Sequence, residues 1–343
     1  MNPELIDQIK GLIFGQAIGD ALGLGTELMT KKQVDYHYPQ GLIDYHQIIQ
    51  DKHRSRWKRG EWTDDTDQML CIVESLLATK TVNSYNIATR IYDWAFQGGR
   101  GLGQTAYEVL THPAFLSNPS AVAKEVWLKS NKNGAANGGI MRTAILGIWQ
   151  YKDANMIKYN AEKVCKITHY DPRCVGSCVV VSLAVSELLK GNKNIDRLLS
   201  YLSEEADAYD ARIREYISPQ KYSNFFVNAL GHLVHQESEI PKLSSDITDL
   251  KLSEPDSLGY TLKAMGSGLW ALAYAESYED GISQIIHEGG DADTNASVAG
   301  ALLGTKFGFS SIPKPWVSGL LRREYLEEKV QKLIQVIDKQ SVK

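Results

Sequence analysis

The stretch Gly-Leu-Ile-Phe-Gly-Gln-Ala-Ile-Gly-Asp-Ala-Leu-Gly at 11–23 repeats glycine at every fourth position of an otherwise apolar run. Residues four apart lie on one face of an α-helix, so these glycines form a stripe without side chains. A second stripe follows far downstream at Ala296, Gly300, Gly304 and Gly308. Glycine costs up to about 1 kcal/mol at an interior helix position, so a packing reason is needed. The stripes predict close backbone approach of these helices to neighbours or to each other.

A membrane helix dimer is the alternative explanation of a glycine stripe. Both segments carry polar residues and are too short to span a bilayer. No uninterrupted apolar stretch approaches the roughly 20 residues of a membrane-spanning helix. The N-terminus also shows no charged-then-apolar signal segment. We therefore expect no membrane partner and a cytoplasmic protein.

The apolar pattern has a period near 3.6 residues through most of the chain, and the alternation typical of strands is scarce. A length of 343 residues with 43% hydrophobic content suits one large core, or two domains at most. We predict an all-α fold in a single domain over 1–343, with insertions at about 31–60, a long covering loop, and 204–257, peripheral helices and loops. Helices are predicted at 4–23, 66–80, 85–97, 119–130, 139–150, 155–168, 174–190, 194–203, 221–235, 258–275, 279–287, 295–306 and 323–339.

Charge and cysteine content exclude further classes of protein. The formal net charge is −4 with Lys and Arg scattered, so no nucleic-acid partner is expected. The four cysteines, Cys71, Cys165, Cys174 and Cys178, contain no CxxC pair. Zinc held by Cys174, Cys178 and His169 would lack a fourth ligand. Buried, inert thiols are the better interpretation.

Two acidic segments more than two hundred residues apart carry the chemistry. They read Glu-Trp-Thr-Asp-Asp-Thr-Asp at 61–67 and Glu-Gly-Gly-Asp-Ala-Asp-Thr-Asn at 288–295, and each leads into an apolar, helix-like run. Helix N-capping is the simpler explanation, but one residue suffices for a cap and three aspartates within four positions repel one another. Magnesium and calcium bind carboxylate, hydroxyl and water oxygens. The pair therefore predicts a split metal site in a hydrolytic enzyme.

Asp20 and Glu27 are two further acidic residues that could contribute to this site, if the fold brings them close to it. Asp20 is on the first predicted helix, and Glu27 is just past its glycine end. Either could serve the same site. The alternatives are a local hydrogen bond for Asp20 and a solvated loop position for Glu27.

Glycine turns at 98–105 and 137–142 are suited to binding an anion. Free N–H groups at a helix start can bind phosphate oxygens, and Arg142 would strengthen this if it faced the same side. Neither turn follows a strand, so neither is a Rossmann turn or a P-loop, and each alone can be an ordinary loop. His169, at a junction between two predicted helices, can line a nucleoside pocket or only mark a helix stop and restart.

Taken in order, these blocks resemble the ADP-ribosylglycohydrolase family. The pair Thr-Asp-Asp-Thr and Gly-Gly-Asp-x-Asp-Thr is specific to that family. The resemblance implies an orthogonal all-α bundle with two Mg²⁺ ions, or Mn²⁺ in some members, at the base of a cleft. The matching segments are 11–27, 63–70, 137–147, 168–178 and 289–304.

The resemblance also implies roles for individual residues. Glu27 matches a mobile acidic residue that gates the metals, and Asp293 is the expected bridge between the ions. One carboxylate would protonate the leaving group and another would guide water, with the assignment open among Glu27, Asp65 and Asp293. The implied metal ligands are Thr63, Asp64, Asp65, Asp291, Asp293 and Thr294. The implied ADP-ribose contacts are Gly99, Gly101, Gly103, Asn137, Gly138, Gly139, Met141, Arg142 and His169.

The function implied is magnesium-dependent hydrolysis of the bond between ADP-ribose and an acceptor, by a monomer. Protein arginine is the first expectation for the acceptor, and ADP-ribosyl-serine and O-acetyl-ADP-ribose are alternatives. A non-catalytic relative is a further alternative, although none of the six implied ligands is missing. A metal-dependent phosphohydrolase and a toxin-neutralising protein of this fold are the remaining ones.

Overall fold

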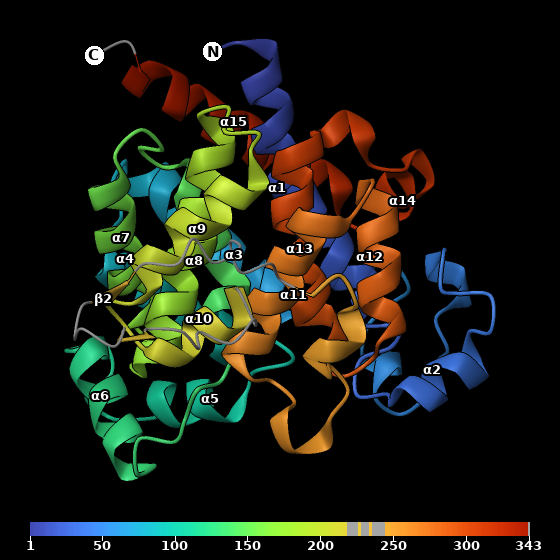
Figure 1. Cartoon of the computed structure of the whole chain (residues 1–343). Helices are drawn as coiled ribbons and strands as arrows, with labels where there is room; N and C mark the ends of the chain where they lie inside the picture. Colours follow the sequence, from blue (N-terminus) through green and yellow to red (C-terminus); the bar gives the residue numbers. More distant parts are fainter. Residues whose placement is uncertain (218–225, 228–232, 235–243, 342–343) are drawn as a thin grey trace.

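Helices account for most of the regular structure (Figure 1), in a computed structural model that describes residues 1–217, 226–227, 233–234 and 244–341. The predicted all-α fold is confirmed. The α-helices are α1 (Pro3–Gly23), α2 (Lys31–His37), α3 (Asp64–Thr79), α4 (Ser84–Phe96), α5 (Gln104–Leu110), α6 (Pro119–Lys129), α7 (Ala154–Cys165), α8 (Pro172–Leu189), α9 (Ile195–Ala206), α10 (Ala211–Ile217), α11 (Thr261–Tyr274), α12 (Tyr278–His287), α13 (Ala292–Phe307), α14 (Lys314–Gly319) and α15 (Arg323–Ser341). The 3₁₀ turns are η1 (Tyr45–Gln47), η2 (Arg54–Arg56), η3 (Ile140–Arg142), η4 (Ala144–Ile148), η5 (Ile247–Leu250), η6 (Pro255–Ser257) and η7 (Phe309–Ser311).

Helices α1 and α13 pack antiparallel with their backbones in direct contact. A side-chain carbon added to Gly11 would overlap the carbonyl oxygen of Gly304, and one added to Gly304 would overlap that of Gly11. The same reciprocal relation joins Gly15 to Gly300. Both helices are buried around their whole circumference along this contact, as expected of core helices. The glycine stripes therefore mark the approach of these two helices to each other.

The ends of the two stripes differ from the prediction. Gly308 lies outside the contact, because it ends α13 with a φ of 82° and packs against Asp7. At the other end Ala292 takes the corresponding place, opposite Gly23. The contact thus extends to the first residue of α13 and the last residue of α1.

Helix α8 is a strongly apolar helix of the core. By length and composition alone it is the one helix among the described residues that could cross a membrane, contrary to our expectation that no stretch comes close. However, 89% of that segment is buried inside the protein. Apolar side chains on all faces are what a central core helix requires.

Two segments have a different secondary structure from the one predicted. The single helix predicted at 139–150 is instead the pair of 3₁₀ turns η3 and η4. The supposed loop at 31–60 contains α2, which starts with a capping box between Thr30 and Gln33, and two 3₁₀ turns. Its local hydrogen bonds stabilise the helix although the segment has little apolar periodicity.

Most of the helix predicted at 221–235 lies outside the described residues. The described part is a short antiparallel ladder of β1 (Phe226–Val227) and β2 (Leu233–Val234), so the helix prediction is wrong there.

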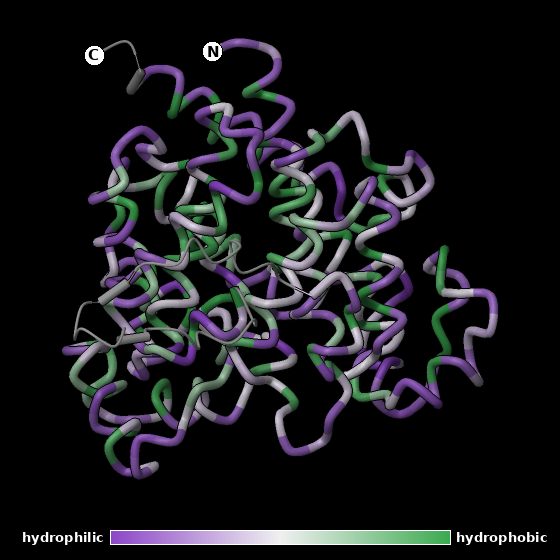
Figure 2. Tube along the Cα trace, in the orientation of Figure 1, coloured by the Kyte–Doolittle hydropathy of each residue, from purple (hydrophilic) through white to green (hydrophobic). Residues whose placement is uncertain are grey.

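The hydropathy of the chain along the trace (Figure 2) shows green, apolar positions concentrated on the inner helices and purple, polar positions along the periphery.

We predict that Gly15→Ala destabilises the protein by about 3 kcal/mol, because the new methyl group overlaps the backbone of α13. The gain in helix propensity is too small to offset this overlap. Gly134→Ala is the control, since a methyl group there meets only the side chain of Ser130, with Oγ at 3.4 Å and Cβ at 4.0 Å. It should change stability by no more than about 0.5 kcal/mol. Equal urea midpoints for the two variants would contradict the packing argument.

Candidate active site

The two acidic segments meet at the N-terminal ends of α3 and α13. Thr63 precedes α3 and Asp291 precedes α13, so both sets of carboxylates lie in or beside a first helical turn. Thr63 Oγ1 donates a hydrogen bond to Asp293 Oδ2 at 3.4 Å, which joins segments 230 residues apart. Both segments contribute to the wall of one cavity of about 330 Å³. The structure therefore brings together the residues of the predicted split site.

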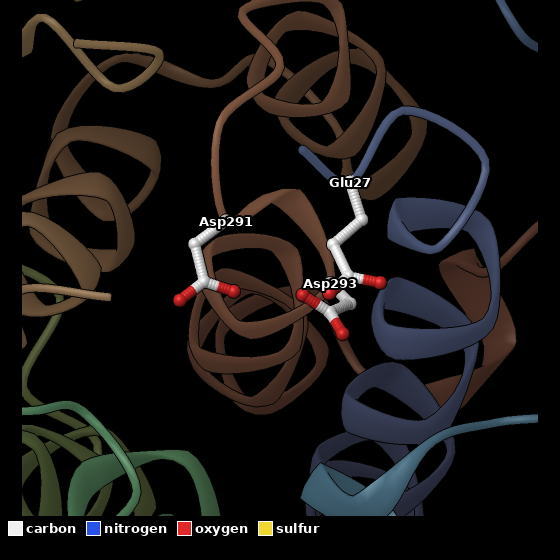
Figure 3. Close-up of side chains that lie close together, drawn as sticks. All are labelled: Glu27, Asp291 and Asp293. Atoms are coloured by element: carbon white, nitrogen blue, oxygen red, sulfur yellow. The ribbon is translucent and has the colours of Figure 1, made fainter. Parts of the chain in front are cut away.

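Glu27 reaches the same cavity from the turn after α1. Carboxylate oxygens of Glu27, Asp291 and Asp293 lie within 4.8 Å of one another. Figure 3 shows the side chain of Glu27 pointing toward Asp293, with Asp291 on the other side of the group. Glu27 is therefore part of the acidic cluster and not a solvated loop residue.

Asp64 and Asp65 form the buried side of the cluster. Burial raises the pKa of both carboxyl groups well above the usual range, and the nearby Asp20 raises them further. Asp65 Oδ1 is fully buried and has no hydrogen-bond partner among the described residues. Gly101, with a φ of 97°, packs so closely on the Asp64 carboxylate that a side chain there would overlap it.

The chemistry of the cluster suits hard cations. The donors that face the cluster are carboxylate and hydroxyl oxygens, the type that Mg²⁺ prefers. Burial and mutual repulsion also raise the pKa of Asp293, so several carboxylates here are costly to keep charged without a counter-ion. A buried carboxylate oxygen without a partner adds an available ligand position. The residues present fit divalent metal binding.

Asp20 has a role that its sequence position did not reveal. Its buried carboxylate accepts hydrogen bonds from Thr63 N at 2.8 Å, Thr66 N at 3.0 Å and Thr66 Oγ1 at 2.6 Å. It therefore caps α3 from α1, in place of the side-chain cap that α3 itself lacks. The hydrogen bonds are long-range, contrary to the local one considered as its alternative role.

Asp67, the third aspartate of the first segment, faces away from the cluster. Its carboxylate accepts hydrogen bonds from Trp62 Nε1 at 2.8 Å and Trp94 Nε1 at 3.0 Å. The guanidinium of Arg322 lies 3.5 Å from it. Asp67 thus fixes the position of α3 while its neighbours face the cavity.

The predicted ADP-ribose contacts divide into two groups. Gly99, Gly139 and Arg142 are not among the residues that line the cavity. Gly99 packs on the ring of Trp94, and Gly139 packs on the sulfur atoms of Cys165 and Cys178. The residues that do line it are Gly101, Gly103, Asn137, Gly138, Met141 and His169.

Arg142 lies behind the cavity wall and controls His169 indirectly. It is fully buried and donates to Gln68 Oε1 at 2.5 Å and to Thr168 Oγ1 at 2.6 Å. Thr168 Oγ1 also lies 2.8 Å from His169 Nδ1, so one hydroxyl links the arginine to the imidazole. Burial and the charge of Arg142 lower the pKa of His169 to about 3. His169 is therefore a neutral imidazole.

The sequence did not predict the hydrogen bond of Asn137 or two apolar residues of the wall. Asn137 Nδ2 donates to Asp291 Oδ2 at 2.8 Å, which ties the glycine turn to the acidic cluster. Leu28 and Leu258 contribute apolar surface to the cavity, although both are more than a third exposed. Leu28 lies in a turn without periodic signal, and Leu258 lies in a turn just before α11, although the helix was predicted to begin at 258. All four cysteines are free and buried, and their burial agrees with the prediction.

The fold and the cavity define an all-α protein with a carboxylate-lined pocket, and comparison with known proteins identifies its family. The family model described as ADP-ribosylglycohydrolase matches residues 1–343, so the chain belongs to the ADP-ribosylglycohydrolase family, enzymes that hydrolyse ADP-ribose linkages. The family resemblance and the enzyme class inferred from the sequence are thereby confirmed.

The relatives are distant but match along most of their length. ADP-ribosylarginine hydrolase Tri1 of Serratia proteamaculans is 22% identical over 96% of this chain and 80% of its own. ADP-ribosyl-[dinitrogen reductase] glycohydrolase of Rhodospirillum rubrum is 24% identical over 93% of this chain and 92% of its own. A solved ADP-ribosylglycohydrolase-related protein complex has the same fold, with a TM-score of 0.70, 24% identity and coverage of 98% of this chain and 100% of that one.

We predict that Asp20→Ala lowers stability by on the order of 3 kcal/mol, because it leaves buried donors of Thr63 and Thr66 without an acceptor. The control is Asp153→Ala, which removes an exposed N-cap of α7 and should cost about 1 kcal/mol. Urea denaturation measures both variants. A loss at Asp20 no larger than that at Asp153 would show that the contact between α1 and α3 is not critical.

Proposed function

We propose that this protein is a magnesium-dependent hydrolase that releases ADP-ribose from arginine side chains of proteins. The observation that carries the proposal is the meeting of Glu27, Asp291 and Asp293 within 4.8 Å in a cavity that also contains Asp64, Asp65 and a neutral His169. Oxygen donors suit the metal, and an uncharged imidazole suits a ribose hydroxyl. Family membership supplies the reaction class.

The metal would be held at the meeting of the two acidic segments. The residues that would hold it are Thr63, Asp64, Asp65, Asp291, Asp293 and Thr294. Two bound Mg²⁺ ions would supply Lewis acidity and orientation for the ribose hydroxyls and for water beside the anomeric carbon. Thr63 and Asn137 hydrogen-bond Asp293 and Asp291, so the carboxylates of α13 are held in place by two other segments.

Glu27 is the best placed group for proton transfer. Its carboxylate lies at the cavity but belongs to a turn outside the two metal-binding segments, so it is the acidic residue of the cavity that is not assigned to the metal. Cleavage through an oxocarbenium-like state requires a carboxyl group that exchanges a proton with the leaving group or with water. We assign that exchange to Glu27 and the stabilisation of positive charge on the sugar to Asp65 and Asp293.

Arginine is the acceptor that the cavity favours. Its described lining includes the five carboxylates of Glu27, Asp64, Asp65, Asp291 and Asp293, and no Lys or Arg. Two bound Mg²⁺ ions would offset four of these five negative charges, and the remaining negative charge favours a cationic guanidinium over a serine hydroxyl or an acetyl ester. The Serratia and Rhodospirillum relatives, named for ADP-ribosylarginine and for ADP-ribosylated dinitrogen reductase, support the same choice.

We predict that Asp293→Asn lowers kcat by more than about 100-fold, because loss of a ligand should exceed the 10–100-fold effects of second-sphere changes. Chelation with EDTA should abolish release of ADP-ribose from an ADP-ribosylated protein, and added Mg²⁺ should restore it. Asp67→Asn is the matched control, since Asp67 belongs to the same motif but faces two tryptophans. It should retain hydrolysis.

The outcomes of this experiment separate the competing functions. Full activity of Asp293→Asn, or activity that survives EDTA, would contradict the metal assignment. Free phosphate as product would indicate a phosphohydrolase. Binding of ADP-ribose without turnover of any conjugate would indicate a non-catalytic relative.

We predict that ADP-ribosyl-arginine is hydrolysed with a higher kcat/KM than ADP-ribosyl-serine or O-acetyl-ADP-ribose. The reason is the charge of the guanidinium leaving group in an acidic cavity. Chromatographic measurement of released ADP-ribose from the three substrates at one Mg²⁺ concentration tests this order. A preference for serine or for the acetyl ester would assign the other acceptor while leaving the hydrolase function intact.

A further inference from the structure

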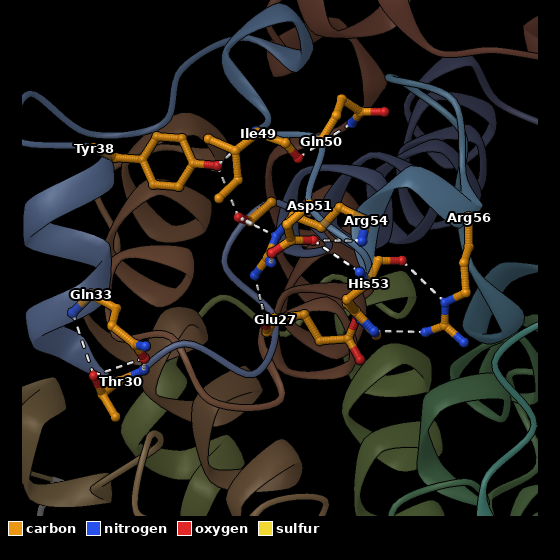
Figure 4. A network of polar contacts seen from close by, with 11 residues as sticks. Glu27, Thr30, Gln33, Tyr38, Ile49, Gln50, Asp51, His53, Arg54 and Arg56 are labelled. Carbon is orange, nitrogen blue, oxygen red and sulfur yellow. Dashed lines mark hydrogen bonds and ion pairs between the residues drawn. The ribbon is translucent and has the colours of Figure 1, made fainter.

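The segment 51–57 packs directly against the turn that carries Glu27 (Figure 4). Arg54 in this segment is 3% exposed, and its Nε donates to Gly25 O at 2.9 Å. The same guanidinium donates to Glu27 O and to the carboxylate of Asp51. A single buried arginine therefore holds two backbone carbonyl groups of the Glu27 turn.

The other side of the Glu27 turn is fixed to the second acidic segment. Leu28 N donates to Gly290 O at 2.7 Å, and Gly290 N donates to Met29 O at 2.8 Å. Thr26 Oγ1 donates to Ile286 O at 2.6 Å. Leu28 has a φ of 62°, an uncommon value for a leucine that local contacts must support. With the backbone fixed on both sides, only the side chain of Glu27 keeps rotational freedom.

His53 restricts that remaining freedom. Its Nε2 lies 2.6 Å from Glu27 Oε2, and both side chains are mostly buried. Its Nδ1 lies 2.7 Å from a terminal nitrogen of Arg56, and its ring packs against Trp57 with centroids 5.7 Å apart. The imidazole is thus held on both nitrogens and on one face.

The contact with Arg56 determines which nitrogen of His53 carries the hydrogen. A guanidinium only donates, so Nδ1 must accept and the hydrogen of the neutral ring lies on Nε2. Nε2 then donates to Glu27. The chain of donors runs from Arg56 through His53 to the carboxylate, and each step has one possible direction.

We propose that His53 is a positioning residue that holds the Glu27 carboxylate toward the acidic cluster, with Arg56 fixing its tautomer. The inference rests on the proposed function, since it assigns Glu27 a part in hydrolysis. His53 acts through Glu27 and does not line the cavity itself. The segment 51–57 is therefore a functional part of the site, connected to it by hydrogen bonds to both the backbone and the side chain of Glu27.

The test compares His53→Phe, which keeps a ring but loses the donor, with His53→Gln, whose amide can donate from a similar position. His53→Phe should lower kcat by on the order of 10- to 100-fold with little change in KM, because misplacement of a reacting group affects chemistry more than binding. His53→Gln should recover most of kcat. Arg56→Ala should give an intermediate loss, and His46→Phe, an exposed histidine of the same insertion, should behave as wild type.

A second measurement does not depend on activity. In crystal structures, the Glu27 side chain should leave its position beside Asp293 in His53→Phe and keep it in His53→Gln. Inactive wild type with this pattern would remove the proposed hydrolysis but keep the contact. Wild-type kcat with an unmoved Glu27 carboxylate in His53→Phe, or equal losses in the Phe and Gln variants, would overturn the positioning role.

Discussion

The backbone contact between α1 and α13 is the constraint on which the rest of the structure depends. Its glycine positions allow the two helices to touch along their length, from Gly11 opposite Gly304 to Gly23 opposite Ala292. That last pair lies directly before the Glu27 turn and at the start of the helix that carries Asp293. The separation of these two carboxylates is therefore set by close-packed backbone, which deforms little compared with long side chains.

A second long-range interaction orients α3 against this pair. Asp20, one residue after the α1 glycine at position 19, supplies the acceptors for the start of α3. Helix α1 thus positions all three acidic elements: it packs against α13, it caps α3, and it leads directly into the turn that carries Glu27. Asp67 completes the arrangement from the outer side, where two indole donors and Arg322 hold it.

The sequence predicted the features that repeat or cluster locally. Each glycine stripe and each acidic segment is a short pattern that can be recognised within about one helix length. The structure brings the two stripes into contact and the two acidic segments into one cavity. The features that it did not predict depend on contacts between distant segments. Arg142 has the right position for an anion site, yet its burial beside Gln68 and Thr168 depends on α3 and the α7–α8 junction. The same is true of His53, which lies in a segment without periodicity.

The free energy needed to bury the carboxylates of the cluster is offset partly by nearby helix ends and partly by the packing of the whole fold. The N-terminal ends of α3 and α13 both face it, and each helix dipole favours nearby carboxylates by about 0.3–1 kcal/mol. That contribution is small beside the several kcal/mol needed to bury each uncompensated charge. The helix ends therefore orient the carboxylates but do not neutralise them. The packing of the α1–α13 core must therefore offset the rest of the free energy needed to bury these charges. A cation that binds only the folded chain would add to the stability of the protein.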